Sequence, residues 1–411
     1  MTRYAVLVAF FLLACGDAAQ AAPASQTPKA SDFFTPEQIA RGKAYRFENR
    51  VVYFVSLCVE VGALVLLLTT GLGGALRDIV SRLAGHRPWL SALLFSASVL
   101  ILLSLVSLPT SLYSGYFHEH AYGMSTQGPR GWLLDYGKST LVNVAVFAPV
   151  GLALWAFIRR FPDGWWLPAW GGAAVGSVLL VFVAPIVIDP IFHTFKPIRD
   201  EAFRGRALDL AGRAGIQVEE VLEMDASART RHVNAYFTGL GRTKRIVIYD
   251  TLLRGTTPDE AALILAHEMG HWRHDHIWKG IGLSCVGTLI ILLVACRSVD
   301  WAAAGGRMGL GGTDDPLALG LVLLLVIILN FLSLPAQSAI SRSFERQADL
   351  ESLRLTDLPD AFVAVERKLS VNNLADVTPG WAAYYLFYTH PSVMERIGMA
   401  LTYKNGDRGS N

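Results

Sequence analysis

Hydrophobic positions in this chain gather into long, nearly uninterrupted blocks instead of the short periodic patterns of a soluble domain. A helix needs about 20 apolar residues to cross a hydrocarbon core of about 30 Å, and a helix satisfies its own backbone there. The pattern predicts six such helices, near residues 51–72, 89–109, 139–158, 166–188, 277–296 and 316–335. The alternative, six helices buried in a soluble core, fits blocks of this length poorly.

The amino terminus has a different pattern. One early arginine, a short apolar stretch and the small residues at 19–21 have the layout of a secretory signal peptide over residues 1–21. An uncleaved seventh span and a lipoprotein site at Cys15 are the alternatives, although Leu13 fits a lipoprotein site poorly. We expect cleavage after Ala21.

Polar segments divide the rest of the chain. Residues 22–50 form a polar segment, for which we expect a short helix ending near Arg50. A polar insert at 193–276 and a tail at 336–411 together hold about 160 residues, enough for one compact domain. The expected parts are therefore the signal peptide, this polar segment, four membrane helices within 51–192, the insert at 193–276, two membrane helices within 277–335 and the carboxy-terminal part at 336–411.

Composition agrees with a membrane protein. The chain is 52% hydrophobic and 17% charged, whereas about a quarter of the residues of a soluble domain are charged. Its net charge of +2 is too small to indicate a nucleic-acid partner. Three of the four cysteines lie in apolar blocks and Cys15 lies in the expected signal peptide, so no disulfide framework is indicated. The expected partner is a lipid bilayer.

The insert carries clear local signals. "EAFRGRALDLAGRAGI" predicts a helix, and "EEVLEMDAS" and "KRIVIYDTLL" predict strands. A second helix begins at "TTPDEAALILAHEMGH", with Thr257 as its cap, Pro258 in the first helical position and Glu260 three residues after the cap. This arrangement is a capping box, with proline where its missing N–H costs nothing.

The same helix contains the pattern His-Glu-x-x-His. Residues four apart on a helix lie one above the other, so His267 and His271 present two imidazoles to one point. Glu268 projects beside that point, where it can take a proton from a water whose pKa a zinc ion lowers to about 7. The spacing therefore favours metal-assisted hydrolysis. The alternative is a surface helix with incidental polar residues.

A catalytic zinc needs a third protein ligand and an open position. Glu345, in "SRSFERQADLESLRL" after the last apolar block, is the candidate, and Asp349 lies on the same face of that helix. Asp349 could fix the tautomer of a ligating histidine. The alternative is a solvated face on which these carboxylates pair with Arg342 and Arg346.

Three further polar residues need an interpretation. His274 and His276 fall off the stripe of the two motif histidines, and we interpret them as membrane-interface residues rather than ligands. Glu60 lies inside the first apolar block, where a charge is costly and therefore indicates function; the alternative is that it faces a wet interior without chemistry.

Several segments together resemble a known family. "HVNAYFTGLGRTKRIVIYDTLL", "AHEMGHWRHDH", "SRSFERQAD" and "YTHPSVMERI" are similar, in order and spacing, to the integral-membrane zinc metallopeptidases of the CAAX prenyl protease type. These are gluzincins, with a His-Glu-x-x-His motif and a downstream glutamate ligand. "RGKAYRFENR", "LPTSLYSGYF" and "APIVIDPIFHTFKPI" extend the resemblance to about residues 38–403.

The resemblance implies a multi-pass α-helical membrane protein with a mainly helical, gluzincin-like zinc domain that carries a small β-sheet. It also implies roles for particular residues. His267, His271 and Glu345 would bind one Zn²⁺ per chain, Glu268 would be the general base, and Asp349 would lie behind the ligands. Asn234 and Ala235 would hold substrate backbone beside an edge strand. His390 would stabilise the oxyanion, and Arg396 would line the substrate groove. From the residues alone, a lone asparagine near a strand and a His-Pro in a loop are more often structural.

The function implied is zinc metalloendopeptidase activity on peptides or proteins, and the signal peptide favours a bacterial inner (cytoplasmic) membrane. Two substrate classes are open: prenylated carboxy-terminal peptides (CAAX-box processing), and membrane proteins subject to quality control.

A protease cutting within the bilayer is a poorer alternative, because the motif is too polar for a span. A non-catalytic membrane scaffold is another. Arginines in short loops favour an outward-facing zinc domain, and basic residues in 23–50 argue the opposite. No feature indicates an oligomeric state.

Overall fold

A computed structural model describes residues 28–216, 218, 220–238 and 245–406. The expected signal peptide at 1–21 lies outside the described residues. The chain divides into two units by its internal contacts, and each is described here by itself. The polar unit holds the described residues of Met1–Glu48, His193–Ile277 and Leu332–Asn411, and the apolar unit holds Asn49–Phe192 and Trp278–Phe331.

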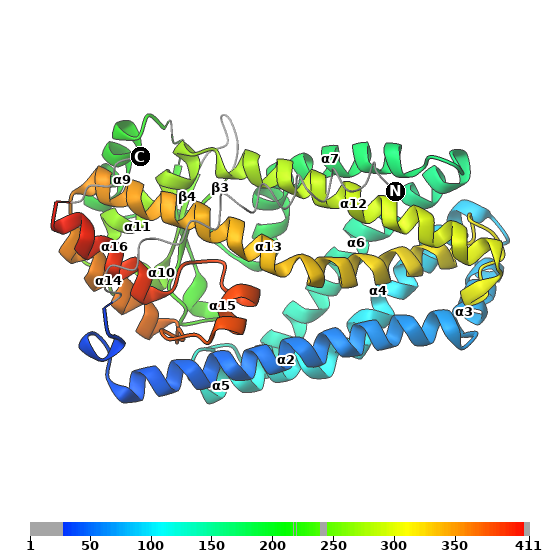
Figure 1. Cartoon of the computed structure of the whole chain (residues 1–411), viewed down its shortest axis with the longest axis horizontal. Helices are drawn as coiled ribbons and strands as arrows, with labels where there is room; N and C mark the ends of the chain where they lie inside the picture. The colour runs from blue at the N-terminus through cyan, green and yellow to red at the C-terminus, as the bar shows by residue number, and fades with distance from the viewer. Residues whose placement is uncertain (1–27, 217, 219, 239–244, 407–411) are drawn as a thin grey trace. The chain divides into compact units, whose positions relative to one another are not determined.

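Six helices in the described part of the chain are long and apolar enough to cross a membrane. Each of the six predicted blocks overlaps one of them, so the hydrophobic pattern predicted their number and order (Figure 1). Their bounds are Pro36–Thr69, Pro88–Ala121, Pro129–Arg160, Trp166–Phe192, His276–Ala304 and Leu317–Thr356.

The first of these helices corrects one expectation. Helix α2 runs without a break over Pro36–Thr69, so the predicted short helix ending near Arg50 was wrong. Around Arg50 the sequence changes from polar to apolar but contains no glycine or proline that would end a helix. A change in hydropathy alters the surroundings of a helix but does not interrupt its backbone hydrogen bonds.

Two of the spans contain a wider, π-helical turn. In the apolar unit, α4 continues into a π-helical turn at Tyr113–His118, and α7 into one at Ala184–Ile188. Pro109 lies one turn before the first of these and Pro185 lies within the second; a proline leaves a carbonyl of the preceding turn without its usual donor. The unit's helices are α3 (Leu72–Leu83), α4 (Pro88–Leu112), α5 (Glu119–Ala121), α6 (Pro129–Arg160), α7 (Trp166–Val183), α8 (Asp189–Phe192), most of α12 (His276–Ala304), a 3₁₀ turn (Arg307–Gly309), and parts of α2 and α13.

The core of the apolar unit lies between several of these helices. Phe95 of α4, Ile158 of α6 and Trp165 before α7 are almost wholly buried in one hydrophobic cluster. Glu60 of α2 accepts a hydrogen bond from Ser107 Oγ of α4 at 3.1 Å. The carboxylate of Glu60 therefore has a polar partner within its own unit.

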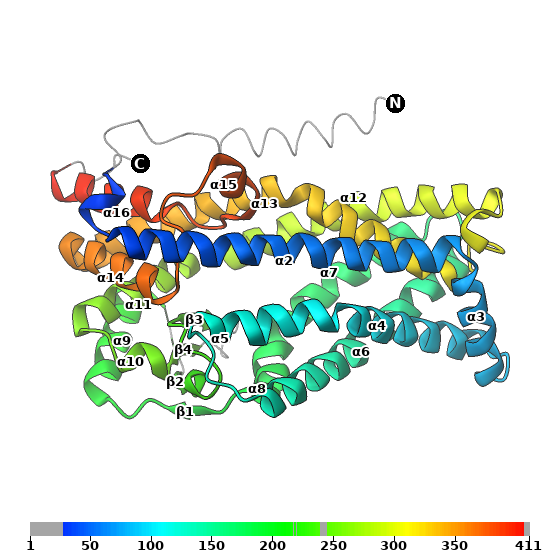
Figure 2. The same cartoon turned by 90° about the horizontal axis from the view of Figure 1, so that it is seen from below.

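A four-stranded sheet lies in the polar unit. Its order is β1-β2-β4-β3, as the labels in Figure 2 show. Strands β2 and β4 are parallel and the outer pairs are antiparallel. Both predicted strands are present, as β2 and β4, and β3 is an edge strand of this sheet. The strands are β1 (Phe195–Pro197), β2 (Glu220–Met224), β3 (Ala235–Thr238) and β4 (Arg245–Tyr249).

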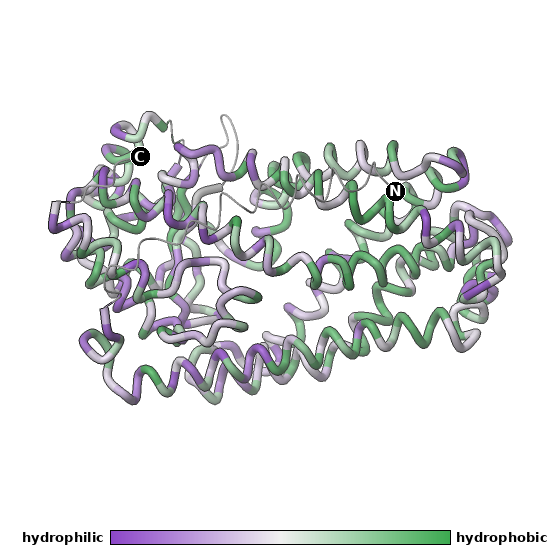
Figure 3. The backbone as a smooth tube through the Cα atoms, in the orientation of Figure 1, coloured by the Kyte–Doolittle hydropathy of each residue, from purple (hydrophilic) through white to green (hydrophobic). Residues whose placement is uncertain are grey.

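Helices cover this sheet and complete the unit. Ile246 and Ile248 of β4 pack with Leu265 and Met269 of α11 in one buried cluster, which fixes α11 against the sheet. The helices are α9 (Glu201–Arg213), α10 (Asp250–Leu253), α11 (Pro258–Arg273), the second part of α13 (Leu317–Thr356), α14 (Pro359–Asn372), α15 (Trp381–Phe387) and α16 (Val393–Lys404), with 3₁₀ turns at Ala30–Asp32 and Ala226–Ala228. Figure 3 shows hydrophobic residues along the first part of α13 and hydrophilic ones in its second part.

The start of α11 has the predicted capping box. Thr257 accepts a hydrogen bond from the Glu260 amide, and the Glu260 carboxylate accepts one from the Thr257 amide at 2.8 Å. Lys368 of α14 also donates to Glu260 at 2.7 Å. The helix that carries the histidine motif is thus held at its first turn by three polar contacts.

Replacing Thr257 by alanine should lower the free energy of unfolding by about 1 kcal/mol, because a backbone N–H loses its acceptor. Thermal unfolding of the detergent-purified protein would measure this loss. Thr257→Ser keeps the hydroxyl and should stay close to wild type. Equal destabilisation by serine and alanine would contradict the role of the cap.

Candidate metal centre

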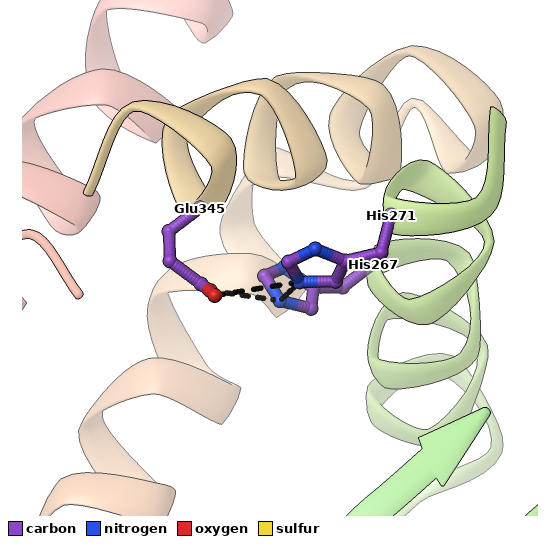
Figure 4. Close-up of side chains that lie close together, drawn as sticks. All are labelled: His267, His271 and Glu345. Atoms are coloured by element: carbon purple, nitrogen blue, oxygen red, sulfur yellow. Dashed lines mark hydrogen bonds and ion pairs between the residues drawn. The ribbon is translucent and has the colours of Figure 1, made fainter. Parts of the chain in front are cut away.

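Three side chains from two helices converge in the polar unit. His267 and His271 project from successive turns of α11, and Glu345 projects toward them from α13, as Figure 4 shows. One ligand atom from each of these residues lies within 4.8 Å of the others. They are the His-Glu-x-x-His histidines and the distant carboxylate expected from the sequence.

The distances fit a shared metal ion. His267 Nε2 lies 3.1 Å from His271 Nε2 and 3.2 Å from a Glu345 oxygen, and His271 Nε2 lies 3.5 Å from the other oxygen. Zinc bonds of about 2.0–2.2 Å would separate tetrahedral ligand atoms by about 3.3–3.6 Å. Glu345 Oε2 is buried without a hydrogen-bond partner in the described part of the chain. A cation between the three groups would satisfy that oxygen, so the donor set fits zinc.

A glycine lets the two helices approach this closely. A Cβ atom built on Gly270 of α11 would lie 2.8 Å from Ala348 Cα and 3.0 Å from its carbonyl oxygen. Backbone atoms cannot move aside as the end of a flexible side chain can. The glycine between the two motif histidines therefore sets how near α11 lies to α13.

Asp349 orients one of the candidate ligands. It is fully buried, and its Oδ1 lies 2.8 Å from His267 Nδ1. Arg396 of α16 donates through Nε to Asp349 Oδ2 at 2.8 Å, and its Nη1 lies 2.6 Å from Glu366 of α14. A chain of buried polar contacts thus runs from Glu366 through the arginine and the aspartate to the imidazole.

The alternative pairing of these carboxylates with neighbouring arginines does not occur. Arg342 donates to the carbonyl oxygens of Tyr384 and Tyr388, at 3.0 and 2.7 Å. Arg346 lies 3.5 Å from Glu395. The face of α13 that bears Glu345 is therefore directed at the histidines and not at solvent.

The carboxylates of the site favour positive charge on the groups they contact. Burial lowers the pKa of His267, but the neighbouring Asp349 and Glu345 carboxylates outweigh burial and raise the pKa to about 10. Burial also lowers the pKa of Arg396, but Asp349 and Glu366 outweigh it and hold the pKa above its ordinary value. Burial raises the pKa of Glu366 to about 7, although Arg396 opposes this.

A cavity of about 120 Å³ adjoins the candidate ligands. Glu268 lines it beside His267, and Asn234 and Ala235 at the start of β3 line it as well. Glu366, His390 and Arg396 complete the polar part of the lining. The rest is apolar: Val233, Leu252, Leu263, Ile264, Phe362, Val365 and Leu369. His390 Nε2 lies 3.1 Å from Glu345 Oε2. The structure thus brings together all the residues expected at the site, although Arg396 uses its guanidinium on Asp349 and Glu366.

One expectation about the neighbouring histidines needs correction. The sequence places His276 away from the stripe of the two motif histidines, but its side chain is buried and its Nδ1 lies 3.0 Å from His271 Nδ1. In a continuous helix, residues five apart would point to different faces. Here α11 ends at Arg273 and α12 begins at His276, and the turn between them brings the two imidazoles together.

Two other residues at the site carried no recognisable signal in the sequence. Glu366 is one of several charged residues in an amphipathic helix, and only the fold shows that it is buried against Arg396. Asn373 accepts from the Val233 amide at 3.1 Å and donates to the Val233 carbonyl at 3.1 Å. These two hydrogen bonds hold the backbone that leads into β3.

Comparison with known proteins identifies the family. Residues 197–404 match the profile of peptidase family M48, and residues 19–194 match that of the "CAAX prenyl protease N-terminal, five membrane helices". The chain belongs to peptidase family M48. It is therefore a multi-pass membrane metallopeptidase that hydrolyses peptide bonds, with a His-His-Glu candidate metal site.

Relatives of this M48 peptidase come from bacteria and eukaryotes. It is 30% identical to the "uncharacterized metalloprotease YhfN" of Bacillus subtilis over 96% of this chain and 93% of that one. It is also 30% identical to "CAAX prenyl protease 1" of Saccharomyces cerevisiae, over 72% and 68% of the two chains. The crystal structure of S. mikatae Ste24p has the same fold, with a TM-score of 0.82, 23% identity and coverage of 97% and 98%.

Gly270→Ala should reduce the bound metal, because the added methyl group would force α11 from α13 and separate the histidines from Glu345. Metal content of the purified protein, measured by atomic emission, would report the loss. Gly212→Ala in α9 is the matched control, because a Cβ there meets no atom within 4 Å. Full metal content in Gly270→Ala would show that the close approach is not needed.

Proposed function

We propose that this protein is a zinc metalloendopeptidase in which His267, His271 and Glu345 hold one Zn²⁺ and Glu268 is the general base. The observation that carries the proposal is the convergence of the three ligand atoms within 4.8 Å, next to a cavity that Glu268 lines. When bound, zinc would polarise the scissile carbonyl and lower the pKa of a water molecule to about 7.

The protein's own groups would carry the proton and stabilise charge. Glu268 would accept a proton from the attacking water and deliver it to the amine nitrogen that leaves. His390 would donate a hydrogen bond to the carbonyl oxygen as that oxygen becomes negative. Its position 3.1 Å from Glu345 supports this role, because it lies within reach of the same point as the candidate ligands.

The substrate would bind as an additional strand. β3 is an edge strand, and Asn234 and Ala235 at its start line the cavity. An extended peptide alongside β3 would form main-chain hydrogen bonds, and the Asn234 side chain would hold its backbone. Arg396 would lie along the groove, but its main role would be to hold Asp349 in place. Asp349 would in turn fix the tautomer of His267.

We also propose a location in the cytoplasmic (inner) membrane of a bacterium. The Bacillus subtilis relative, which aligns with 96% of this chain, supports it. The eukaryotic relatives are named CAAX prenyl proteases, and that name favours peptides with a prenylated carboxy-terminal cysteine as substrates. Quality control of membrane or exported proteins is the second candidate, since the bacterial relative's name states no substrate.

Glu268→Gln should keep zinc and lower kcat/KM for a cleavable peptide by about 100-fold to 10,000-fold, because the proton acceptor is lost while the ligands remain. His267→Ala should lose both zinc and cleavage. Metal analysis together with a fluorogenic peptide assay would measure both properties. Equal activity of Glu268→Gln and wild type would refute the base assignment.

Peptide mapping should separate the two substrate classes. Matched peptides with and without a farnesyl group on the carboxy-terminal cysteine would be incubated with wild type and with Glu268→Gln, and the products sequenced by mass spectrometry. Cleavage that requires the farnesyl group supports the CAAX type. Cleavage of unmodified, unfolded membrane-protein segments with no preference for the lipid supports quality control and contradicts the first class.

A further inference from the structure

The turn between α11 and α12 places a fourth imidazole behind the candidate metal site. Asp275 takes a positive φ of 54°, which interrupts the helix within two residues of the end of α11. His276, the first residue of α12, is only 6% exposed as a result. Its ring stacks on Phe344 of α13, with 4.3 Å between the ring centroids and 10° between the planes.

Both ring nitrogens of His276 face polar atoms. Nδ1 lies 3.0 Å from His271 Nδ1, and Nε2 lies 3.4 Å from Gln347 Oε1 of α13. Gln347 in turn donates through Nε2 to Ser343 Oγ at 3.4 Å. The ring is therefore fixed in its plane by Phe344 and in its rotation by a polar atom at each nitrogen.

Coordination chemistry determines the direction of these hydrogen bonds. His271 turns Nε2 toward Glu345 and His267, so a metal there would use the lone pair of Nε2 and leave the proton on Nδ1. That proton must be donated, and His276 Nδ1 is the atom that lies in its path. His276 must then carry its own proton on Nε2, where the Gln347 carbonyl oxygen accepts it.

We propose that His276 is a positioning residue that fixes the tautomer and orientation of the ligand His271, as Asp349 does for His267. This inference rests on the proposed zinc site. The two ligands would then be held differently, one by a buried carboxylate and the other by a neutral imidazole. Groups that hydrogen-bond to ligating histidines typically change metal affinity or activity 10-fold to 100-fold when removed.

Two variants separate the hydrogen bond from the packing. His276→Phe keeps an aromatic ring against Phe344 but has no acceptor, and it should weaken zinc binding about 10-fold to 100-fold in a chelator competition. His276→Asn loses the ring but places its carbonyl oxygen where Nδ1 was, and it should recover most of the affinity. His274→Phe is the matched control two residues away. The His274 imidazole lies 3.7 Å from Glu351 and stacks on His276 with 5.7 Å between the ring centroids; phenylalanine keeps that ring contact, so zinc affinity should not change.

A spectroscopic measurement tests the coordination of the metal without an assay of peptidase activity. Cobalt substituted for zinc should give a changed visible absorption spectrum in His276→Phe and a spectrum close to wild type in His276→Asn. Should His276→Phe fail to fold, Gln347→Met removes the acceptor for Nε2–H instead and should weaken zinc binding in the same direction.

Three results would overturn the inference: wild-type zinc affinity in His276→Phe, equal losses in the phenylalanine and asparagine variants, or unchanged affinity in Gln347→Met. Failure of the underlying zinc site would look different. In that case the wild-type protein itself would bind no stoichiometric zinc, and His271→Ala would change nothing.

Discussion

The close packing of α11 against α13 is the contact on which the site depends. The two motif histidines need only one helix, because four residues of α-helix return a side chain to the same face. The carboxylate is 74 positions beyond His271 in the chain and becomes a neighbour only through this packing. Gly270 makes the approach possible. The capped start of α11 and its contacts with β4 fix the position of α11, and therefore where the histidines lie relative to Glu345.

Buried charge is the second constraint on the site. Asp349, Glu366 and Arg396 are close together in the interior of the polar unit, and an unpaired charge there would be costly. The arginine between two carboxylates lowers this cost and leaves Asp349 able to accept from His267. Helices α13, α14 and α16 each supply one member of this group. The orientation of the His267 imidazole therefore depends on how these three helices pack.

Much of this organisation could be predicted from residues alone. Apolar blocks of this length are difficult to interpret as anything but membrane-spanning helices. The Thr-Pro-x-Glu start of α11 forms its cap through local hydrogen bonds that need no tertiary contact. The identity of the third ligand could not be decided in this way, since Glu345 fits a solvated face equally well by spacing. The resemblance to a known family favours Glu345 as a ligand, because it assigns the role to the motif and not to the spacing.

Where prediction failed, tertiary structure had replaced a local rule. Helical periodicity does not extend past the positive φ at Asp275, where the helix stops, and so it does not predict the position of His276. The change of hydropathy near Arg50 does not coincide with a change of backbone, and so it does not predict the end of α2. Glu366 and Asn373 gave no signal, because burial and cross-chain hydrogen bonds are properties of the folded unit.

The proposed pairing of substrate with the edge strand β3 has a consequence for which proteins would be cut. Main-chain N–H and C=O groups are the same in every residue, so a strand that pairs with a substrate through them recognises an extended shape more than a particular sequence. A segment already hydrogen-bonded within its own helix or sheet cannot pair in this way until it unfolds. Susceptibility to this peptidase would then follow the free energy of local unfolding of each potential substrate, and stably folded proteins would be spared.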